Sequence, residues 1–400
     1  MRNAILATCS VAALLTAGIA QSAKAQTMNY GSLEMMFGEP VTTSATGSPQ
    51  KASDAPVPLE IITAEDIKRS GLSNIADIVS RVSGVNVQHS AAQGYDIGVR
   101  GYNEPLAGRL LVLVNGRQVY LDFFGFTDWS ALPVRLEEIQ QIEVVKGPNT
   151  ALFGFNAAAG VINIVTFNPA YDDKSAVTAR GGSNSTTEVS GAATYKFAPG
   201  SGVRLSAGYD REREYPYSDN QVGATLGNKG LRADPSANTI AGEGTFTVAD
   251  GTQLIVEATS TFHDYNVMVS PTYSVGQFEI RTQSYKGELV SNTPFGLVTA
   301  RLYDNETQGN YEQQIPINSS LLVAQVQDLF KAGADTTVRV SGEFRTNSMH
   351  STPEDTGTVK YNVYSGGLMA EHKFGPAYTL TASRRRTAGR AGCRRRCAAR

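Results

Sequence analysis

The feature that most constrains this chain is an alternating pattern between residues 174 and 382. Apolar and polar side chains alternate from one position to the next, most clearly over residues 188–197, 203–210 and 338–345. A period of two predicts β-strands that turn one face toward an apolar environment. The expected strands are ~10–14 residues long, which suits tilted strands that cross a membrane better than strands of a soluble sheet.

The connections between these strands carry a second pattern, because short and long ones alternate. Short turns are expected at Ala198–Gly202, Ala249–Gly251, Asn292–Gly296, Ala332–Asp335 and Phe374–Ala377, and long polar loops at 214–236, 265–278, 305–318 and 346–360. Outer-membrane barrels have short turns at one end and long loops at the other. A soluble β-sandwich is the alternative, but it does not explain this alternation. The count of ~10–11 strands is too small to enclose a separate domain of about 110 residues.

Residues 57–168 predict such a separate α+β domain. Leu59–Ile62 is expected as a strand, followed by a helix that Thr63 and Asp66 cap and that ends at Gly71. A second helix is expected to start at Ser73. Its apolar face is formed by Ile75, Ile78, Val79 and Val82. Asn115-Gly116 predicts a tight hairpin turn after the apolar run 110–114.

The first 56 residues predict export and then a linker. Residues 1–25 have the order of a secretory signal, with Arg2, an apolar core and the cleavage site Ala23-Lys24-Ala25. Residues 26–56 are rich in Ser, Thr, Gly and Pro and are expected to be flexible. Within them, Glu39-Pro40-Val41-Thr42-Thr43-Ser44-Ala45-Thr46 is β-prone and suited to add a strand to a partner's sheet, with a plain linker as the alternative. Residues 26–382 contain no cysteine, so disulfides are not expected to hold the fold.

Charge argues against a nucleic-acid partner. The formal net charge is -2, but the signal and residues 383–400 together hold ten of the 35 basic residues and no acidic ones. The body between them is therefore clearly acidic. Residues 383–400 form an anomalous Arg-rich tail, which we interpret as the product of a frameshift. The strand that starts at Tyr378 is then expected to end at Ala382. The tail's two cysteines have no accompanying histidine, so a metal site is not expected.

No catalytic constellation is found in the sequence. The four histidines lack metal-ligand spacing, and no nucleotide-binding or nucleophile motif is present. We therefore expect no catalytic residue, no metal and no cofactor, and the protein is not expected to be an enzyme. The segment Ile142–Thr166 contains two apolar runs around a Gly- and Ala-rich stretch, which either cradles a ligand or lets backbone pack closely.

That segment carries a family resemblance. The order Ile142-Glu143-Val144-Val145-Lys146-Gly147-Pro148, then Phe153-Gly154, then Gly160-Val161-Ile162-Asn163-Ile164-Val165-Thr166 resembles the plug domain of TonB-dependent outer-membrane receptors. Lys146 stands where the family usually has Arg. The pieces Val57–Thr63, Ile97–Tyr102 and Leu111–Arg117 resemble the same domain, and the likeness continues into the first expected barrel strands.

The resemblance implies a plug at 57–168 and barrel strands at 174–382, which are about half of a 22-stranded barrel. It implies uptake of a scarce nutrient such as a ferric siderophore across the outer membrane of a Gram-negative bacterium, with haem or cobalamin as alternatives. The implied partners are TonB, with ExbB and ExbD, a metal chelate or similar small molecule, and membrane lipid. Glu39–Thr46 would be the TonB box.

The resemblance also implies the site residues. The plug apex would bind ligand through the loops Gln88–Asp96 and Leu121–Ser130, with packing against the barrel wall as the alternative role. The expected ligand-binding residues are Gln88, His89, Tyr95, Phe123, Phe124, Phe126 and Trp129. The expected plug–barrel contacts are Arg100, Glu143 and Lys146.

The leading hypothesis is such a receptor in truncated form, because we interpret the Arg-rich tail as a frameshift product. The second hypothesis is a binding or inert remnant, in which the plug folds alone in the periplasm and does not transport. A periplasmic enzyme is a third class, for which the residues offer no support.

Overall fold

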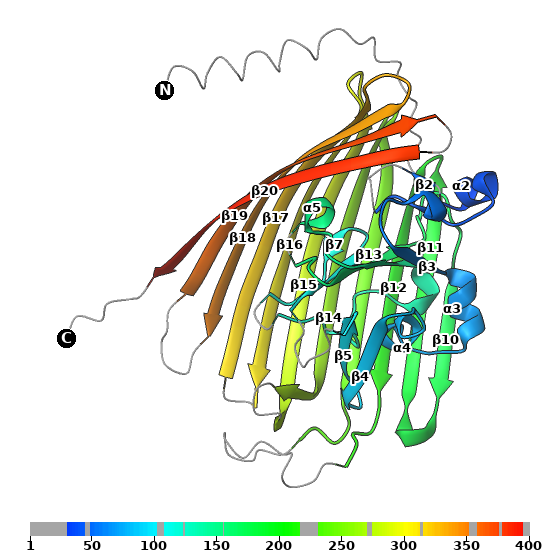
Figure 1. Ribbon diagram of the computed structural model, residues 1–400. Helices are drawn as coiled ribbons and strands as arrows, with labels where there is room; N and C mark the ends of the chain where they lie inside the picture. The colour runs from blue at the N-terminus through cyan, green and yellow to red at the C-terminus, as the bar shows by residue number, and fades with distance from the viewer. Residues whose placement is uncertain are drawn as a thin grey trace.

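A computed structural model describes residues 30–44, 49–101, 108–122, 125–154, 156–216, 231–269, 274–312, 315–351, 358–375 and 378–394. They form a small plug that lies on the concave face of a large curved sheet (Figure 1). The predicted fold class, an α+β plug followed by antiparallel strands of an incomplete barrel, is confirmed. Within the described residues, no helix combines the length and apolar character that a membrane span requires.

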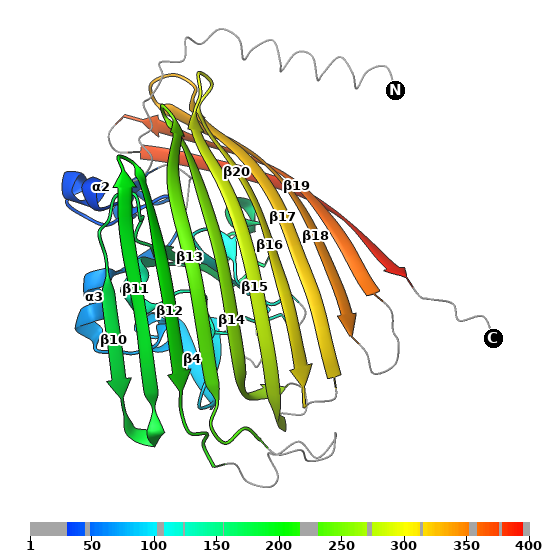
Figure 2. The same cartoon turned by 180° about the vertical axis from the view of Figure 1, so that it is seen from behind.

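The large sheet is an antiparallel meander in which each strand pairs with the next along the chain (Figure 2). Its strands are β10 (Ala176–Gly181), β11 (Thr187–Ala198), β12 (Ser201–Arg211), β13 (Ser236–Ala249), β14 (Thr252–Val269), β15 (Ser274–Asn292), β16 (Leu297–Tyr311), β17 (Ile315–Lys331), β18 (Thr336–Ser351), β19 (Thr358–Phe374) and β20 (Tyr378–Arg394). All five expected short turns lie between strands at one end of this sheet.

The opposite end of the sheet differs from the expectation. Only β12 and β13 are separated by a long segment; strands β14–β19 continue through most of the residues expected as long loops at 265–278, 305–318 and 346–360. Polar residues such as Asp264, Asn266 and Gln277 still alternate with apolar ones there, and backbone pairing continues through them. Ladder hydrogen bonds join backbone groups and do not require an apolar side chain.

The last strand also corrects a prediction. We expected the strand from Tyr378 to end at Ala382, but β20 pairs with β19 as far as Arg394. Arg385, within the Arg-rich segment, forms an ion pair with Glu343 at 3.1 Å. The edge of β19 offers backbone partners along its whole length, so the side-chain composition of residues 383–394 does not end the strand.

The convex face of the sheet is apolar, and the concave face is mainly polar, apart from an apolar patch that includes Tyr265 and Phe278. Large apolar side chains exposed on the outside include Val177, Val189, Tyr195, Leu205, Ile240, Tyr285, Leu302, Val326, Val340 and Leu368. On β13 the outward positions, such as Ile240, alternate with buried inward ones, such as Thr239 and Ala241. A lipid-facing apolar band around a polar interior is the surface of a membrane barrel.

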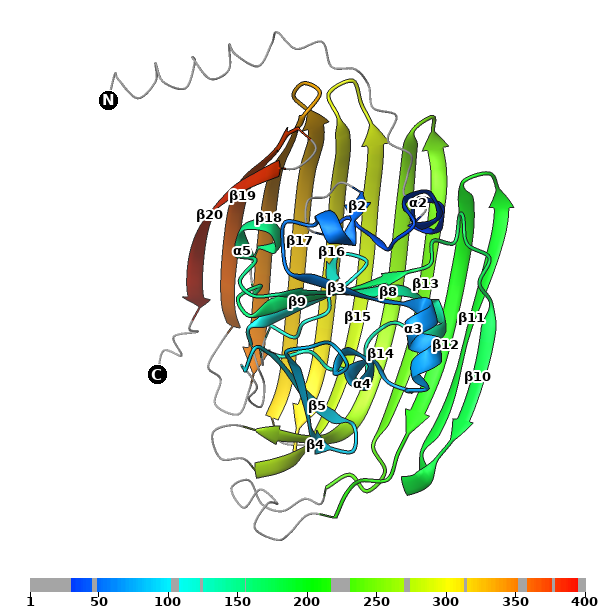
Figure 3. The ribbon, with the colours of Figure 1, turned by 45° about the vertical axis from the view of Figure 1, so that its right-hand side comes forward.

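The plug is built on a five-stranded mixed sheet whose strands run across those of the large sheet (Figure 3). Its order is β3 (Leu59–Thr63), β8 (Ile139–Lys146), β9 (Gly160–Thr166), β6 (Leu110–Val114) and β7 (Arg117–Gln118). A separate hairpin is formed by β4 (Val85–Ala91) and β5 (Gly94–Val99). The helices are α3 (Ala64–Ser70), α4 (Ile75–Val79) and the short α5 (Thr150–Phe153), with a 3-10 turn, η2 (Leu136–Glu138).

The predicted local signals are present in the plug. Thr63 and Asp66 form a capping box at α3, and Gly71 ends it at φ 68°. The hydrogen bond from the Thr63 hydroxyl lowers the pKa of Asp66. The cap of α4 is Asn74 rather than Ser73, because the Asn74 side chain accepts from the Asp77 amide at 2.7 Å. Asn115 and Gly116 have positive φ and join β6 to β7, as predicted.

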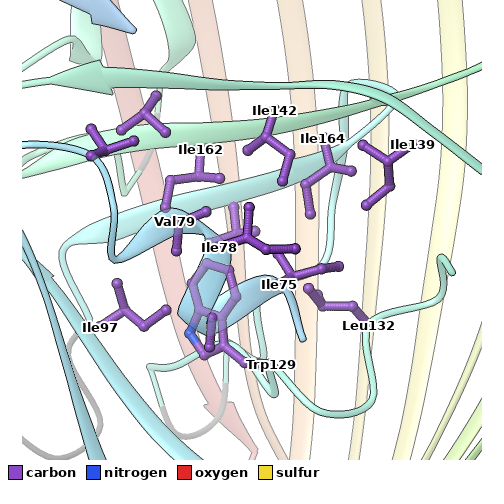
Figure 4. Packing of buried hydrophobic residues seen from close by; sticks show 14 of the residues in the cluster. Ile75, Ile78, Val79, Ile97, Trp129, Leu132, Ile139, Ile142, Ile162 and Ile164 are labelled. Atoms are coloured by element: carbon purple, nitrogen blue, oxygen red, sulfur yellow. The ribbon is translucent and has the colours of Figure 1, made fainter. Parts of the chain in front are cut away.

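The plug core packs the apolar face of α4 against β8 and β9 (Figure 4). Ile142, Ile162 and Ile164 from the sheet meet Ile75, Ile78 and Val79 from the helix, and Trp129 and Leu132 close one side. The Gly- and Ala-rich stretch serves close packing: a Cβ added at Gly160 would lie 2.7 Å from the Val145 carbonyl oxygen. Such an approach excludes any larger residue at position 160.

The outer band leads to a first prediction. Replacing Ile240, which is mid-strand and 65% exposed, with Arg should destabilise the inserted sheet by about 2–4 kcal/mol, because a charge would face the bilayer midplane. The same change at Val248, which is 55% exposed but next to the short turn, should cost about 0–1 kcal/mol. Urea unfolding in lipid vesicles, followed by the loss of β-sheet circular dichroism, measures both. Equal losses would show that this face does not lie in a bilayer.

Candidate functional site

The turn between β6 and β7 is held by charged side chains of the sheet's inner wall. Arg117 is 1% exposed. Its guanidinium donates to Glu257 Oε1 at 2.7 Å, to Asn305 Oδ1 at 3.3 Å and to Thr259 Oγ1 at 3.3 Å. Lys286 lies 3.0 Å from the other Glu257 oxygen, so this carboxylate is shared by two cations. One plug arginine is thereby bonded to β14 and β16.

The backbone of the same turn is also bound. Arg301 donates to the Gly116 carbonyl oxygen at 3.1 Å, and its guanidinium pairs with Glu288 on the neighbouring strand. A Cβ at Gly116 would lie 2.5 Å from Arg301 Nη1, so glycine allows both the positive φ and this approach. The predicted hairpin turn is therefore also a contact with the sheet.

A second buried network joins the plug to β12 and β13. Arg204 of β12 donates to Glu138 of η2 at 2.9 Å and to Glu243 of β13 at 3.0 Å. It also donates to the Thr166 hydroxyl at 2.8 Å. Both Arg204 and Glu138 side chains are 4% exposed. Arg135 adds an ion pair with Asp210 and a hydrogen bond to Thr239.

These contacts differ from those expected. Lys146 forms its ion pair with Glu60 of the plug, and Glu143 bonds to Gln141 and Asn163 within the plug sheet. Arg100 is exposed. Within the described chain, none of the three predicted residues, Arg100, Glu143 and Lys146, bonds to the large sheet. The motif marks the plug's own strands β8 and β9, whereas the contacts come from the turn and η2 beside them.

The β4–β5 hairpin forms the plug apex and brings three predicted residues together. Residues Gln88–Asp96 were expected as a loop but are mostly paired strand. Gln88 and His89 are exposed, and His89 packs edge-on against Tyr95 with ring centroids 4.6 Å apart. A hydrogen bond from His89 to Asp77, at 3.1 Å, raises the pKa of His89 and lowers that of Asp77.

The hairpin tip is fixed against the sheet. Gln93 bonds to His263 of β14, whose ring also bonds to Asp128 of the second apical segment at 2.8 Å. The Ala92 amide donates to Glu214 at 2.9 Å. His263 is fully buried and stacks on Tyr265 at 3.8 Å. The sequence showed His263 only as an isolated histidine in an alternating strand.

The described aromatic residues of Leu121–Ser130 are packed in the interior, which was the alternative to a ligand-binding role. Trp129 lies in the plug core, and Phe126 packs on an apolar wall formed by Tyr265, Val267, Phe278, Ile280 and Ile317. Both are 7% exposed, so neither is presented to a ligand in this structure. Phe123 and Phe124 lie outside the described residues.

The N-terminal segment lies on the plug. Val41–Thr42 (β1) pairs with Gln50–Lys51 (β2), after helix α2 (Tyr30–Phe37). Val41 and Thr42 are fully buried, although residues 26–56 were expected to be flexible. Glu39 accepts from Ser53 at 2.9 Å and pairs with Lys51 at 3.3 Å. Pro40 precedes β1, and Thr43 and Ser44 follow it, whereas Ala45 and Thr46 lie outside the described residues.

A cavity of about 350 Å³ lies between plug and sheet. Thr43, Ser44 and Asn163 line one side and cationic side chains of the sheet, including Arg301 and Arg339, line the other. In the described part of the chain, no group of three or more acidic, His or Cys side chains is placed to hold a metal ion. The candidate site therefore consists of the buried contacts between plug and sheet, the cavity between them, and the N-terminal strand that is bound to the plug.

Comparison with known proteins agrees with this architecture. Residues 51–161 match the family model of the TonB-dependent Receptor Plug Domain. The chain is 28% identical to the vitamin B12 transporter BtuB of Vibrio vulnificus over 196 residues, which are 48% of this chain and 31% of that protein. It is 33% identical to BtuB of Photobacterium profundum over 135 residues, which are 34% of this chain and 22% of that protein.

Solved structures show the same fold. A mutant of the ferric enterobactin receptor PfeA from Pseudomonas aeruginosa has a TM-score of 0.66 at 17% identity, over 87% of this chain and 59% of that one. FpvA of P. aeruginosa, bound to a heterologous pyoverdine–iron complex, has a TM-score of 0.66 at 14% identity, over 89% and 55%. The chain thus spans less than two thirds of the length of each of these relatives.

The buried contacts lead to a second prediction. Replacing Arg117 with Ala should destabilise the docked plug by about 2–3 kcal/mol, because Glu257 would lose one of its two buried cations and keep only Lys286. Replacing Arg211 with Ala should lower the free energy of unfolding by no more than about 1 kcal/mol, because its ion pair with Asp234 is exposed. Urea unfolding monitored at Trp129 compares the two. A loss for the Arg117 variant no larger than that for the Arg211 variant would contradict the role given to Arg117.

Proposed function

We propose that this chain, which has the plug and barrel strands of a TonB-dependent receptor, acts in energy-coupled uptake of a scarce nutrient at the outer membrane. The observation that carries the proposal is the plug held on the polar inner wall by buried pairs such as Arg117–Glu257 and Glu138–Arg204. A domain bonded in this way obstructs the interior of a barrel. Passage of a ligand then requires work on the plug.

The position of Glu39–Thr46 supports coupling to TonB. It precedes the plug and includes a short strand, β1, which is the kind of segment that joins a partner's sheet by strand addition. In our proposal TonB, working with ExbB and ExbD, binds this segment and transmits force to the plug. The apolar outer face of the large sheet supports an outer-membrane location, and lipid is the partner of that face.

We propose a metal chelate such as a ferric siderophore as the ligand, bound at the plug apex. Gln88, His89 and Tyr95 lie together on the β4–β5 hairpin and offer hydrogen-bonding and aromatic groups. Ferric siderophore receptors are among the solved structures with this fold. Cobalamin is the second candidate, because the sequence relatives are vitamin B12 transporters. Haem is a third, for which the rings of His89 and Tyr95 are equally suited.

The single tryptophan offers a direct test of ligand binding. Trp129 lies beside the apex, and no other tryptophan contributes to the emission. Titrating the detergent-folded chain with ferric enterobactin should quench Trp129 saturably, and cyanocobalamin and haemin serve as the competing probes. Replacing His89 with Ala should weaken binding about tenfold through loss of one charge-assisted hydrogen bond. Replacing His372, at the short-turn end of β19, should leave it unchanged.

The three probes distinguish the candidate ligands. Saturable quenching by cyanocobalamin alone would replace the siderophore with the cobalamin assignment. Quenching by none of the three probes would contradict an apical site for these ligands. A chain that binds a probe but leaves the outer-membrane fraction, and whose gel mobility does not change on heating, would be the non-transporting plug remnant.

A further inference from the structure

Glu143 is a carboxylate that the plug buries completely. It lies at the centre of β8, opposite Ile61 of β3 on one side and Asn163 of β9 on the other. Its relative exposure is 0%. Burial raises the pKa of Glu143, and only neutral hydrogen-bond donors act against that shift. A buried carboxylate without a cation depends on such donors.

The donors come from two parts of the chain. Gln141 Nε2 donates to Glu143 Oε1 at 2.8 Å, and Asn163 Nδ2 donates to Oε2 at 3.0 Å, both from the plug sheet. The Ser44 hydroxyl donates to Oε2, and the Thr42 side chain also bonds to this carboxylate. Asn163 additionally donates to Ser44 Oγ at 2.9 Å. The N-terminal segment thus supplies two of the four side chains that bond to Glu143.

The same segment has both of its edges occupied. On one edge, Val41 and Thr42 pair with Lys51 and Gln50 of β2. On the other, the Val41 carbonyl oxygen accepts from Gln141 Nε2 at 2.9 Å. A strand held in this way has no edge for another sheet, so strand addition requires that β1 first leaves the plug. Departure would also remove Thr43 and Ser44 from the wall of the cavity.

We propose that Glu143 is the positioning residue that anchors Val41–Ser44 on the plug and so sets how often this strand is available to a partner. The identity of the partner rests on the proposed function, but the anchoring does not. When β1 leaves, water replaces the two hydroxyl donors. The free energy that favours the docked segment is therefore a small difference, and a single substitution changes it. Loss of one buried hydrogen bond shifts such an equilibrium by about tenfold.

Hydrogen exchange measures the anchor directly. In the full chain folded in detergent, Ser44→Ala should speed amide exchange across Val41–Ser44 by about tenfold, because the docked segment opens more often. Ser53→Ala is the matched control. Ser53 lies in the turn that follows β2, and its hydroxyl bonds to Glu39 in an exposed position. Exchange in this variant should match the parent chain. Glu143→Ala should also speed exchange, and adding Ser44→Ala to it should have little further effect.

Two outcomes separate the anchor from the proposed function. Equal exchange rates in the Ser44→Ala and Ser53→Ala chains would overturn the anchor, and this comparison stands even if Glu143→Ala fails to fold. Binding of the periplasmic domain of TonB to a synthetic peptide of residues 39–53 tests the partner separately. A peptide that does not bind, together with faster exchange in Ser44→Ala, would count against coupling to TonB and leave the anchor intact.

Discussion

Arg117 brings a permanent positive charge out of water and into the contact between plug and sheet. Removing a charge from water is costly unless other charges and hydrogen bonds replace the solvent. Here Glu257 supplies the opposite charge, and Asn305 and Thr259 supply acceptors. Because these partners lie on β14 and β16, the arginine is satisfied only when the plug has one particular position against the curved sheet. The placing of the apex and of the N-terminal strand depends on this docking.

Strands β8 and β9 connect the regions that the proposed function uses. At one end, Glu138 directly before β8 and Thr166 at the end of β9 bond to Arg204 of the sheet. At their centre, Glu143 and Asn163 bond to the N-terminal segment. Their apolar face packs on α4, whose residue Asp77 bonds to His89 of the apical hairpin. A force applied at β1 would therefore reach first the two strands that form the centre of the plug sheet.

The sequence was sufficient for features that depend on local chemistry. The capping box at Thr63, the turn at Asn115-Gly116 and the alternation of β12 all require only neighbouring residues, and all are present. The buried contacts could not be predicted, since Arg117 and Glu257 are 140 positions apart and no local pattern pairs them. The buried state of Trp129 and Phe126 was equally beyond reach, because an aromatic residue has the same sequence signal in a ligand site and in a core.

The docking of the plug on the sheet's inner wall is the central claim, and a chemical crosslink between the two tests it most directly. The side chains of Glu137 of η2 and Ser190 of β11 meet, with Oε1 and Oγ 3.0 Å apart. Cysteines at these positions, in a chain whose three natural cysteines are replaced by serine, should be joined in membranes by a short bismaleimide reagent. Cysteines at the cross-strand partners Thr252 and Ser291 serve as the control within the sheet. A crosslink at the control pair with none between positions 137 and 190 would contradict the docked arrangement.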